Sequence, residues 1–275
     1  MTVDRRAFLA SSLAAVALPA GGASARGAGL AASPQYAGSA REPVRAAGLA
    51  PPPDGLMKLI AAYPDQLSHA DGETLVWRDG TRMAWSDGVA GKSLDAKLVR
   101  PCLADQMSIP YPPGPIAAAP ARDQDPGRIR YQPFFEKMYG ASEAQVRRNL
   151  VNVSWEPARK DFLVTRVNAI DRLLGEIGEE IARMPAAIAR FARDPAGSFN
   201  YRDVAGTSAK SGHAFGIAFD IDSRLSRYWR WDRPPRWRND VPYPLVEAFE
   251  RRKFVWGGKW CHYDTMHFEY RPELF

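Results

Sequence analysis

The chain is poor in the side chains that most often bind structural metals. Its 275 residues include two cysteines, Cys102 and Cys261, and only four histidines. Neither cysteine has cysteine or histidine neighbours at zinc-finger spacing, which excludes a structural site of that kind. In an oxidising compartment the two cysteines either form one disulfide bond that closes a long loop or remain free thiols. A centre that uses imidazole must therefore be built from His69, His213, His262 and His267.

Long apolar runs are also missing. The most apolar stretch follows Arg5-Arg6, ends near Leu18 and holds about 12 apolar residues, too few to span a bilayer. It leads to Ala23-Ser24-Ala25, and this order is typical of an export signal over residues 1–25. The arginine pair followed by Phe-Leu favours the twin-arginine pathway, and an uncleaved anchor is the alternative. We expect a periplasmic or secreted protein that does not span the membrane.

The charge is basic but not concentrated. Thirty-seven lysines and arginines against 31 acidic residues give a net charge of +6, and no long basic block appears. Outside the cell membrane this balance favours the cell wall or a membrane surface as a partner and argues against nucleic acid.

Residues 26–54 are rich in Ala, Gly, Pro and Ser and are expected to form a flexible tether. Residues 55–275 then form a single domain, within the size range of one hydrophobic core. Residues 74–77 and 82–85 around Asp79-Gly80 predict a hairpin, and residues 101–133 a loop. Apolar spacing predicts a helix capped by Ser142 that carries Val146, Leu150 and Val153. It predicts a second helix over residues 159–184, with Phe162, Val167, Ile170, Leu174, Ile177 and Ile181 on one stripe.

The chemistry begins after Pro195. If residues 216–222 form a strand, Ile217, Phe219 and Ile221 face the core, and Gly216, Ala218, Asp220 and Asp222 face the other side. His213 lies just before this strand and can bend toward the side of Asp220.

A second cluster follows at residues 264–269. In an extended segment His267 and Glu269 share a face, with Met266, Phe268 and Tyr270 in the core. Asp264 reaches the same side only if a turn or bulge precedes His267. The two clusters together supply two imidazoles and two carboxylates, which is the set needed by a catalytic zinc with three ligands, one open position and a base.

The segment Ser211 to Asp220 fits S-x-H-x-x-G-x-A-x-D, and residues 264–269 fit D-x-x-H-F-E. Both motifs resemble the zinc D-Ala-D-Ala carboxypeptidase and L-alanyl-D-glutamate endopeptidase family, which shares a fold with the signalling domain of hedgehog proteins. The resemblance implies that His213, Asp220 and His267 bind Zn2+ and that Asp264 is the general base. It also implies that Arg202, within Phe199-Asn200-Tyr201-Arg202, steadies the oxyanion. Asp264 is more similar to the endopeptidases than to the vancomycin-resistance dipeptidases, which have Glu.

Several neighbours receive weaker assignments. Ser211 and Glu269 are candidates for holding a ligand imidazole in the correct tautomer. Trp256 and Trp260 either line a substrate cleft or belong to the core. His262 is either a substrate contact or an exposed loop residue, and Asp222 is a turn or salt-bridge residue.

These observations predict an α+β fold of the hedgehog/DD-peptidase kind, in which a small antiparallel sheet carries the metal site and helices from about 142 to 193 pack behind it. The predicted function is hydrolysis of peptidoglycan stem peptides by one Zn2+ per chain. The alternative is a catalytically silent zinc-containing module that binds the cell wall or takes part in signalling.

Overall fold

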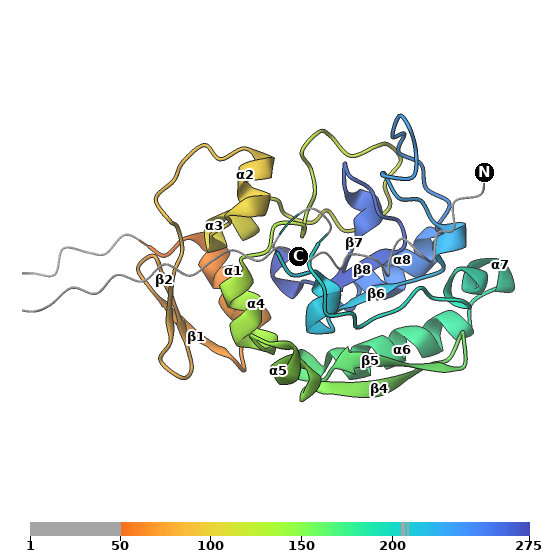
Figure 1. The fold of residues 1–275 in the computed structure, drawn as a ribbon, viewed down its shortest axis with the longest axis horizontal. Coiled ribbons are helices and arrows are strands. Elements are labelled where there is room, and N and C mark those ends of the chain that lie inside the picture. The colour runs from red at the N-terminus through yellow and green to blue at the C-terminus, as the bar shows by residue number, and fades with distance from the viewer. Residues whose placement is uncertain (1–50, 205–206, 208) are drawn as a thin grey trace, which may run out of the picture.

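The computed structural model describes residues 51–204, 207 and 209–275 (Figure 1). The predicted export signal and most of the predicted tether lie outside these residues. Helix α1 (Asp54–Ala62) begins directly after Pro51-Pro52-Pro53. Among the described residues, none of the helices has the length and apolar character needed to cross a membrane.

The N-terminal part of the fold is a small antiparallel sheet with short helices beside it. Strand β2 pairs with both of its neighbours in the order β1–β2–β3. The hairpin predicted around Asp79-Gly80 is confirmed: Gly80 has φ +83°, and Trp77 N–H donates to the Thr81 carbonyl at 2.9 Å. The elements here are β1 (Leu67–Asp71), β2 (Thr74–Trp77), β3 (Arg82–Ala84), α2 (Leu94–Val99) and α3 (Leu103–Gln106). Helix α3 is a correction, because residues 101–133 were expected to be a loop.

Both helices that were predicted in the middle of the chain differ from the observed elements. The Ser142 hydroxyl does cap a helix, accepting from Gln145 N–H at 3.3 Å, but that helix ends at Arg147. Leu150 and Val153 lie instead in β4, which pairs with β5 along its whole length. The second predicted helix begins eleven positions late, at Ile170, because residues 160–165 form β5. The elements are α4 (Gln132–Tyr139), α5 (Glu143–Arg147), β4 (Leu150–Trp155), β5 (Lys160–Thr165), α6 (Ile170–Ala182) and α7 (Ala186–Ala189).

The C-terminal part holds a three-stranded antiparallel sheet in the order β6–β8–β7. Its elements are β6 (Ala218–Asp220), α8 (Tyr243–Glu250), β7 (Phe254–Trp256) and β8 (His267–Tyr270). Figure 1 shows α6 and the β4–β5 hairpin beside this sheet. The Phe249 ring of α8 stacks on Phe268 with centroids 3.8 Å apart, and Trp155 of β4 lies 4.4 Å from Phe219. These aromatic contacts bury one face of the sheet, and the strand alternation leaves the other face for polar side chains.

The fold is therefore α+β with small antiparallel sheets, as the sequence predicted. Strand β6 is shorter than the expected 216–222, but the expected core face is confirmed, since Ile217, Phe219 and Ile221 are at most 1% exposed.

Candidate metal centre

Strands β6 and β8 bring two of the predicted ligands together. Their antiparallel register places Asp220 directly opposite His267, while Phe219 lies opposite Phe268 on the core face. Side chains at directly opposed positions of an antiparallel pair lie on the same face and in contact. Asp220 Oδ1 is accordingly 3.0 Å from His267 Nδ1.

The third predicted ligand comes from a single 3-10 turn, η4 (Gly212–Phe215), directly before β6. The Ser211 hydroxyl caps the turn by accepting from His213 N–H at 3.3 Å. Gly216 ends it at φ +69°, a conformation that favours glycine, and a Cβ there would approach Leu150 Cδ2 to 2.6 Å. The turn directs His213 Nε2 to 3.2 Å from His267 Nδ1 and 3.2 Å from Asp220 Oδ1.

The three donor atoms fit a tetrahedral zinc ion. Bonds of 2.0–2.1 Å at tetrahedral angles separate two ligand atoms by about 3.3 Å, close to the 3.0–3.2 Å found here. The other ring nitrogens are already engaged: His213 Nδ1–H donates to the Ser198 carbonyl at 2.5 Å, and His267 Nε2–H donates to Glu269 at 3.3 Å. With both rings neutral, these bonds leave the facing nitrogens as electron-pair donors that can bind one shared cation.

The charges of the site favour the same conclusion. Burial opposes ionisation of Asp220, but His213 and His267 outweigh it and hold the pKa of Asp220 well below its usual range. Burial lowers the pKa of His267, while its bonds to Asp220 and Glu269 outweigh this and raise the pKa to about 9. In the metal-free protein His267 thus carries a second ring proton at neutral pH, and a metal ion would take the place of that second proton.

Asp264 lies beside these ligands without joining them. His267 N–H donates to the Asp264 carbonyl at 3.2 Å, which closes the turn that the sequence required before His267. The Asp264 carboxylate lines the same pocket, and its Oδ1 is buried without a hydrogen-bond partner among the described residues. Burial and the charge of Asp220 raise the pKa of Asp264 to about 7. A carboxylate with these properties can act as a proton acceptor for a water or substrate in the pocket.

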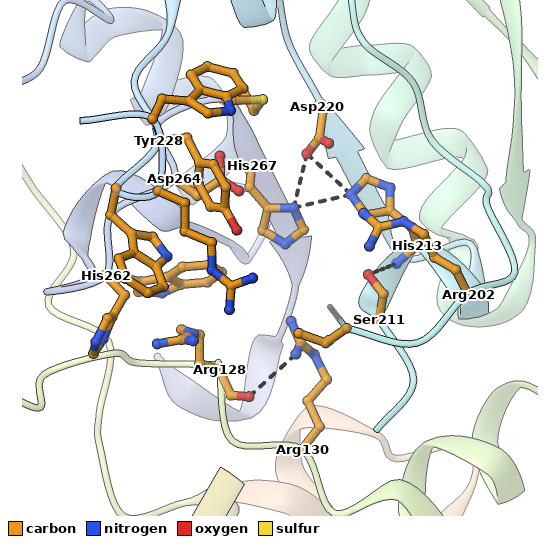
Figure 2. A pocket seen from close by; sticks show the side chains of 16 residues that line it. Arg128, Arg130, Arg202, Ser211, His213, Asp220, Tyr228, His262, Asp264 and His267 are labelled. Atoms are coloured by element: carbon orange, nitrogen blue, oxygen red, sulfur yellow. Dashed lines mark hydrogen bonds and ion pairs between the residues drawn. The ribbon is translucent and has the colours of Figure 1, made fainter. Parts of the chain in front are cut away.

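An open pocket lies above the centre, and its wall is rich in arginine and aromatic side chains (Figure 2). Arg202 lines it, with Nε buried and without a hydrogen-bond partner among the described residues. Trp260 lines it too, and its ring centroid is 5.4 Å from that of His267. The other arginine and aromatic residues of the wall are Arg128, Arg130, Arg230, Tyr228, Trp229 and Trp231.

Several predicted neighbours have a different place or partner. Trp256 is outside the pocket lining and 2% exposed, so the core alternative holds for this residue. Ser211 bonds to the backbone of His213, and the group that orients the His213 ring is the carbonyl of Ser198. Glu269 is hydrogen-bonded to the His267 ring at 3.3 Å, in the position that the predicted role requires.

The remaining candidates are also placed by their contacts. Asp222 pairs with Arg224 at 2.7 Å, as a salt-bridge residue. His262 lines the pocket and bonds to Asp125 at 2.7 Å, which makes it more than an exposed loop residue. Cys102 and Cys261 are free thiols in this structure.

Sequence reasoning missed the residues that support Glu269. Arg130 donates to the Glu269 carboxylate through Nε and Nη2, and Arg271 Nη1 donates to it at 3.3 Å. Burial alone would raise the pKa of Glu269, but Arg130, His267 and Arg271 hold it well below its ordinary value. Arg130 precedes Glu269 by 139 positions, so no local motif could have connected them.

Comparison with known families agrees with this geometry. Residues 205–270 match the family model described as D-alanyl-D-alanine carboxypeptidase. The match includes His213, Asp220, Asp264 and His267, confirms the resemblance, and is consistent with the hedgehog/DD-peptidase-like fold. It supports a peptidase and covers about a quarter of the chain, with Arg202 outside it. No curated protein and no solved structure matches the chain.

Proposed function

We propose that the chain is a zinc peptidase that hydrolyses peptidoglycan stem peptides, as an L-alanyl-D-glutamate endopeptidase or a D-alanyl-D-alanine carboxypeptidase. The observation that carries the proposal is the triangle of donor atoms 3.0–3.2 Å apart beside an unpaired carboxylate, within the segment that matches the family. A structural zinc site would not need the neighbouring acid or the open pocket.

Each of these residues has a separate role in the proposed reaction. His213, Asp220 and His267 would hold the zinc ion, which when bound supplies electrophilic activation of the substrate carbonyl and of a water. Asp264 accepts the proton of the attacking water and returns it to the leaving amine. Arg202 directs N–H donors toward the negative charge that develops on the carbonyl oxygen, and loss of such a donor costs about 3 to 4 kcal/mol of barrier.

The proposal includes the location. An export signal at residues 1–25 of the twin-arginine type would deliver the enzyme to the periplasm or the exterior, where its substrate is found. Stem peptides are anionic, and the net charge of +6 favours their approach.

The test is digestion of purified sacculi with zinc-loaded protein, followed by mass spectrometry of the released peptides. Product masses identify the bond that is cut. Asp264→Asn should abolish release, whereas Asp240→Asn, a change of the same type at an exposed residue, should leave it unchanged. Zinc-loaded parent protein that releases nothing more than Asp264→Asn would contradict the proposal and favour the silent zinc-containing module.

A further inference from the structure

Arg128 and Arg130 line the pocket, although the segment from Asp125 to Arg130 lies far from the matched residues in sequence. Hydrogen bonds from the C-terminal part of the chain hold its backbone. Trp260 Nε1–H donates to the Pro126 carbonyl at 2.7 Å, and Arg271 Nη1–H donates to the Gly127 carbonyl at 2.5 Å. These bonds fix the segment against the residues around the metal centre.

Asp125 anchors two side chains of the pocket wall. Its carboxylate is fully buried, and Oδ2 lies 2.5 Å from Arg128 Nη1 and 2.7 Å from His262 Nδ1. Asp125 Oδ1 also accepts from His262 N–H at 3.0 Å. A buried carboxylate that binds an arginine in this way removes much of the arginine's conformational freedom before any ligand arrives.

Arg128 retains donors for a ligand. Its Nη1 is bonded to Asp125, while its Nε and Nη2 make no hydrogen bond within the described part of the chain. Arg130 differs, because Glu269 binds two of its nitrogens. Figure 2 shows Arg128 and Arg130 on the side of the pocket across from Asp220.

The arginines act on a common region of the pocket. Burial and the charge of Asp264 raise the pKa of Tyr228, while Arg230, Arg128 and Arg202 each act to lower it. Their guanidinium groups therefore lie within electrostatic range of one hydroxyl next to the proposed base. An anionic group entering the pocket meets several positive charges close to Asp264.

We propose that Arg128, positioned by Asp125, binds a carboxylate group of the substrate near the bond that is cut. The inference rests on the proposed peptidase function and deepens it by naming the recognised group. A guanidinium with two available donors matches a planar carboxylate, and a carboxamide offers only one comparable acceptor. The enzyme then discriminates against stem peptides in which that carboxylate is amidated. A stem peptide carries two such groups near the two candidate bonds, the α-carboxylate of D-glutamate and the C-terminal carboxylate.

The experiment uses four synthetic stem pentapeptides: unmodified, amidated at D-glutamate, amidated at the C-terminus, and amidated at both. For zinc-loaded wild-type protein kcat/KM is measured on each, and the dissociation constants are measured with zinc-loaded Asp264→Asn. Amidation of one group should reduce kcat/KM and binding by about tenfold or more, because a polar site rejects an analogue that leaves its donors unpaired. The group whose amidation lowers kcat/KM and weakens binding is the carboxylate that the site recognises.

Two variants assign the effect to Arg128. In Arg128→Gln the penalty for amidation should fall to about threefold or less, and Arg128→Lys should restore part of it through charge without the paired donors. Arg122→Gln is the matched control, because Arg122 is a highly exposed arginine of the same region outside the pocket. Zinc content and circular dichroism of each variant show that the fold is retained.

The outcomes separate this inference from the peptidase proposal. Cleavage of all four peptides at similar rates, or a penalty that Arg128→Gln leaves unchanged, overturns the carboxylate site and leaves the peptidase intact. Failure to cleave any peptide, with binding that still depends on the carboxylate and on Arg128, overturns the peptidase and retains the site. Absence of both cleavage and carboxylate-dependent binding overturns both.

Discussion

Zinc binding should strengthen steeply as the pH rises, because zinc and a proton compete for His267. The bonds from His267 to Asp220 and Glu269 raise the pKa of His267 to about 9 in the metal-free protein. At pH 7 that imidazole is about 99% protonated. A zinc ligand must be deprotonated, so binding at pH 7 has to release this proton.

The size of the effect follows from these values. With one proton displaced, the dissociation constant for zinc falls about tenfold for each pH unit up to about pH 9. Asp264, with a pKa of about 7, is about half protonated at pH 7 and adds up to about half a proton if zinc promotes its ionisation. The expected release at pH 7 is therefore at least about one proton per zinc.

Calorimetric titrations with zinc in buffers of different ionisation enthalpy measure the number of protons released. Competition with a chelator between pH 6.5 and 8.5 gives the dissociation constants. Asp264→Asn removes the contribution of that carboxyl and should still release the proton of His267. A release below about half a proton at pH 7, together with an affinity that does not depend on pH, would refute the assignment of His267 as a ligand.

Three further predictions follow from the same geometry. Asp264→Asn should lower kcat by about 10²- to 10⁴-fold while zinc affinity by chelator competition stays nearly the same, since we propose Asp264 as the base and not as a ligand; a comparable loss of zinc would contradict this. Gly212→Ala should weaken zinc binding by about 10- to 100-fold, because a Cβ at Gly212 would collide with the Glu269 carboxylate that orients His267; unchanged affinity in the folded variant would show that Glu269 has no such role. The metal-free protein should lose stability to urea as the pH rises from about 6.5 to about 9, since a raised pKa of His267 stabilises the fold only while the imidazole is protonated. The zinc-loaded protein should lack that loss, and equal pH dependence of both forms would be inconsistent with it.

The placement of the candidate metal ligands was predictable because strand and turn rules act over short distances. Asp220 and His267 each lie on a strand whose alternate residues are apolar, so their orientation away from the core followed from the sequence. The turn before His267 was predictable for the same reason, since Asp264 could reach that face only through a change of direction.

The predicted helices over the middle of the chain failed for a different reason. Leu150 and Val153 satisfy a helical spacing, and Phe162 and Val167 extend the stripe of α6 toward the N-terminus. Residues 150–155 also satisfy strand alternation through Val151, Val153 and Trp155, and the last two are buried. Local spacing does not distinguish these possibilities for short segments, and the pairing of β4 with β5 decided between them.

The amino-acid sequence by itself determined the side chains available for a metal and the strand face on which Asp220 and His267 lie, because alternation and turn formation depend on neighbours in the chain. Only the tertiary structure decided which distant groups hold those side chains in place: the Ser198 carbonyl behind His213, Arg130 behind Glu269, and Asp125 behind Arg128. Such contacts depend on how separate segments meet in space. Every residue has a backbone carbonyl, so the residue type at position 198 does not indicate that its carbonyl orients His213.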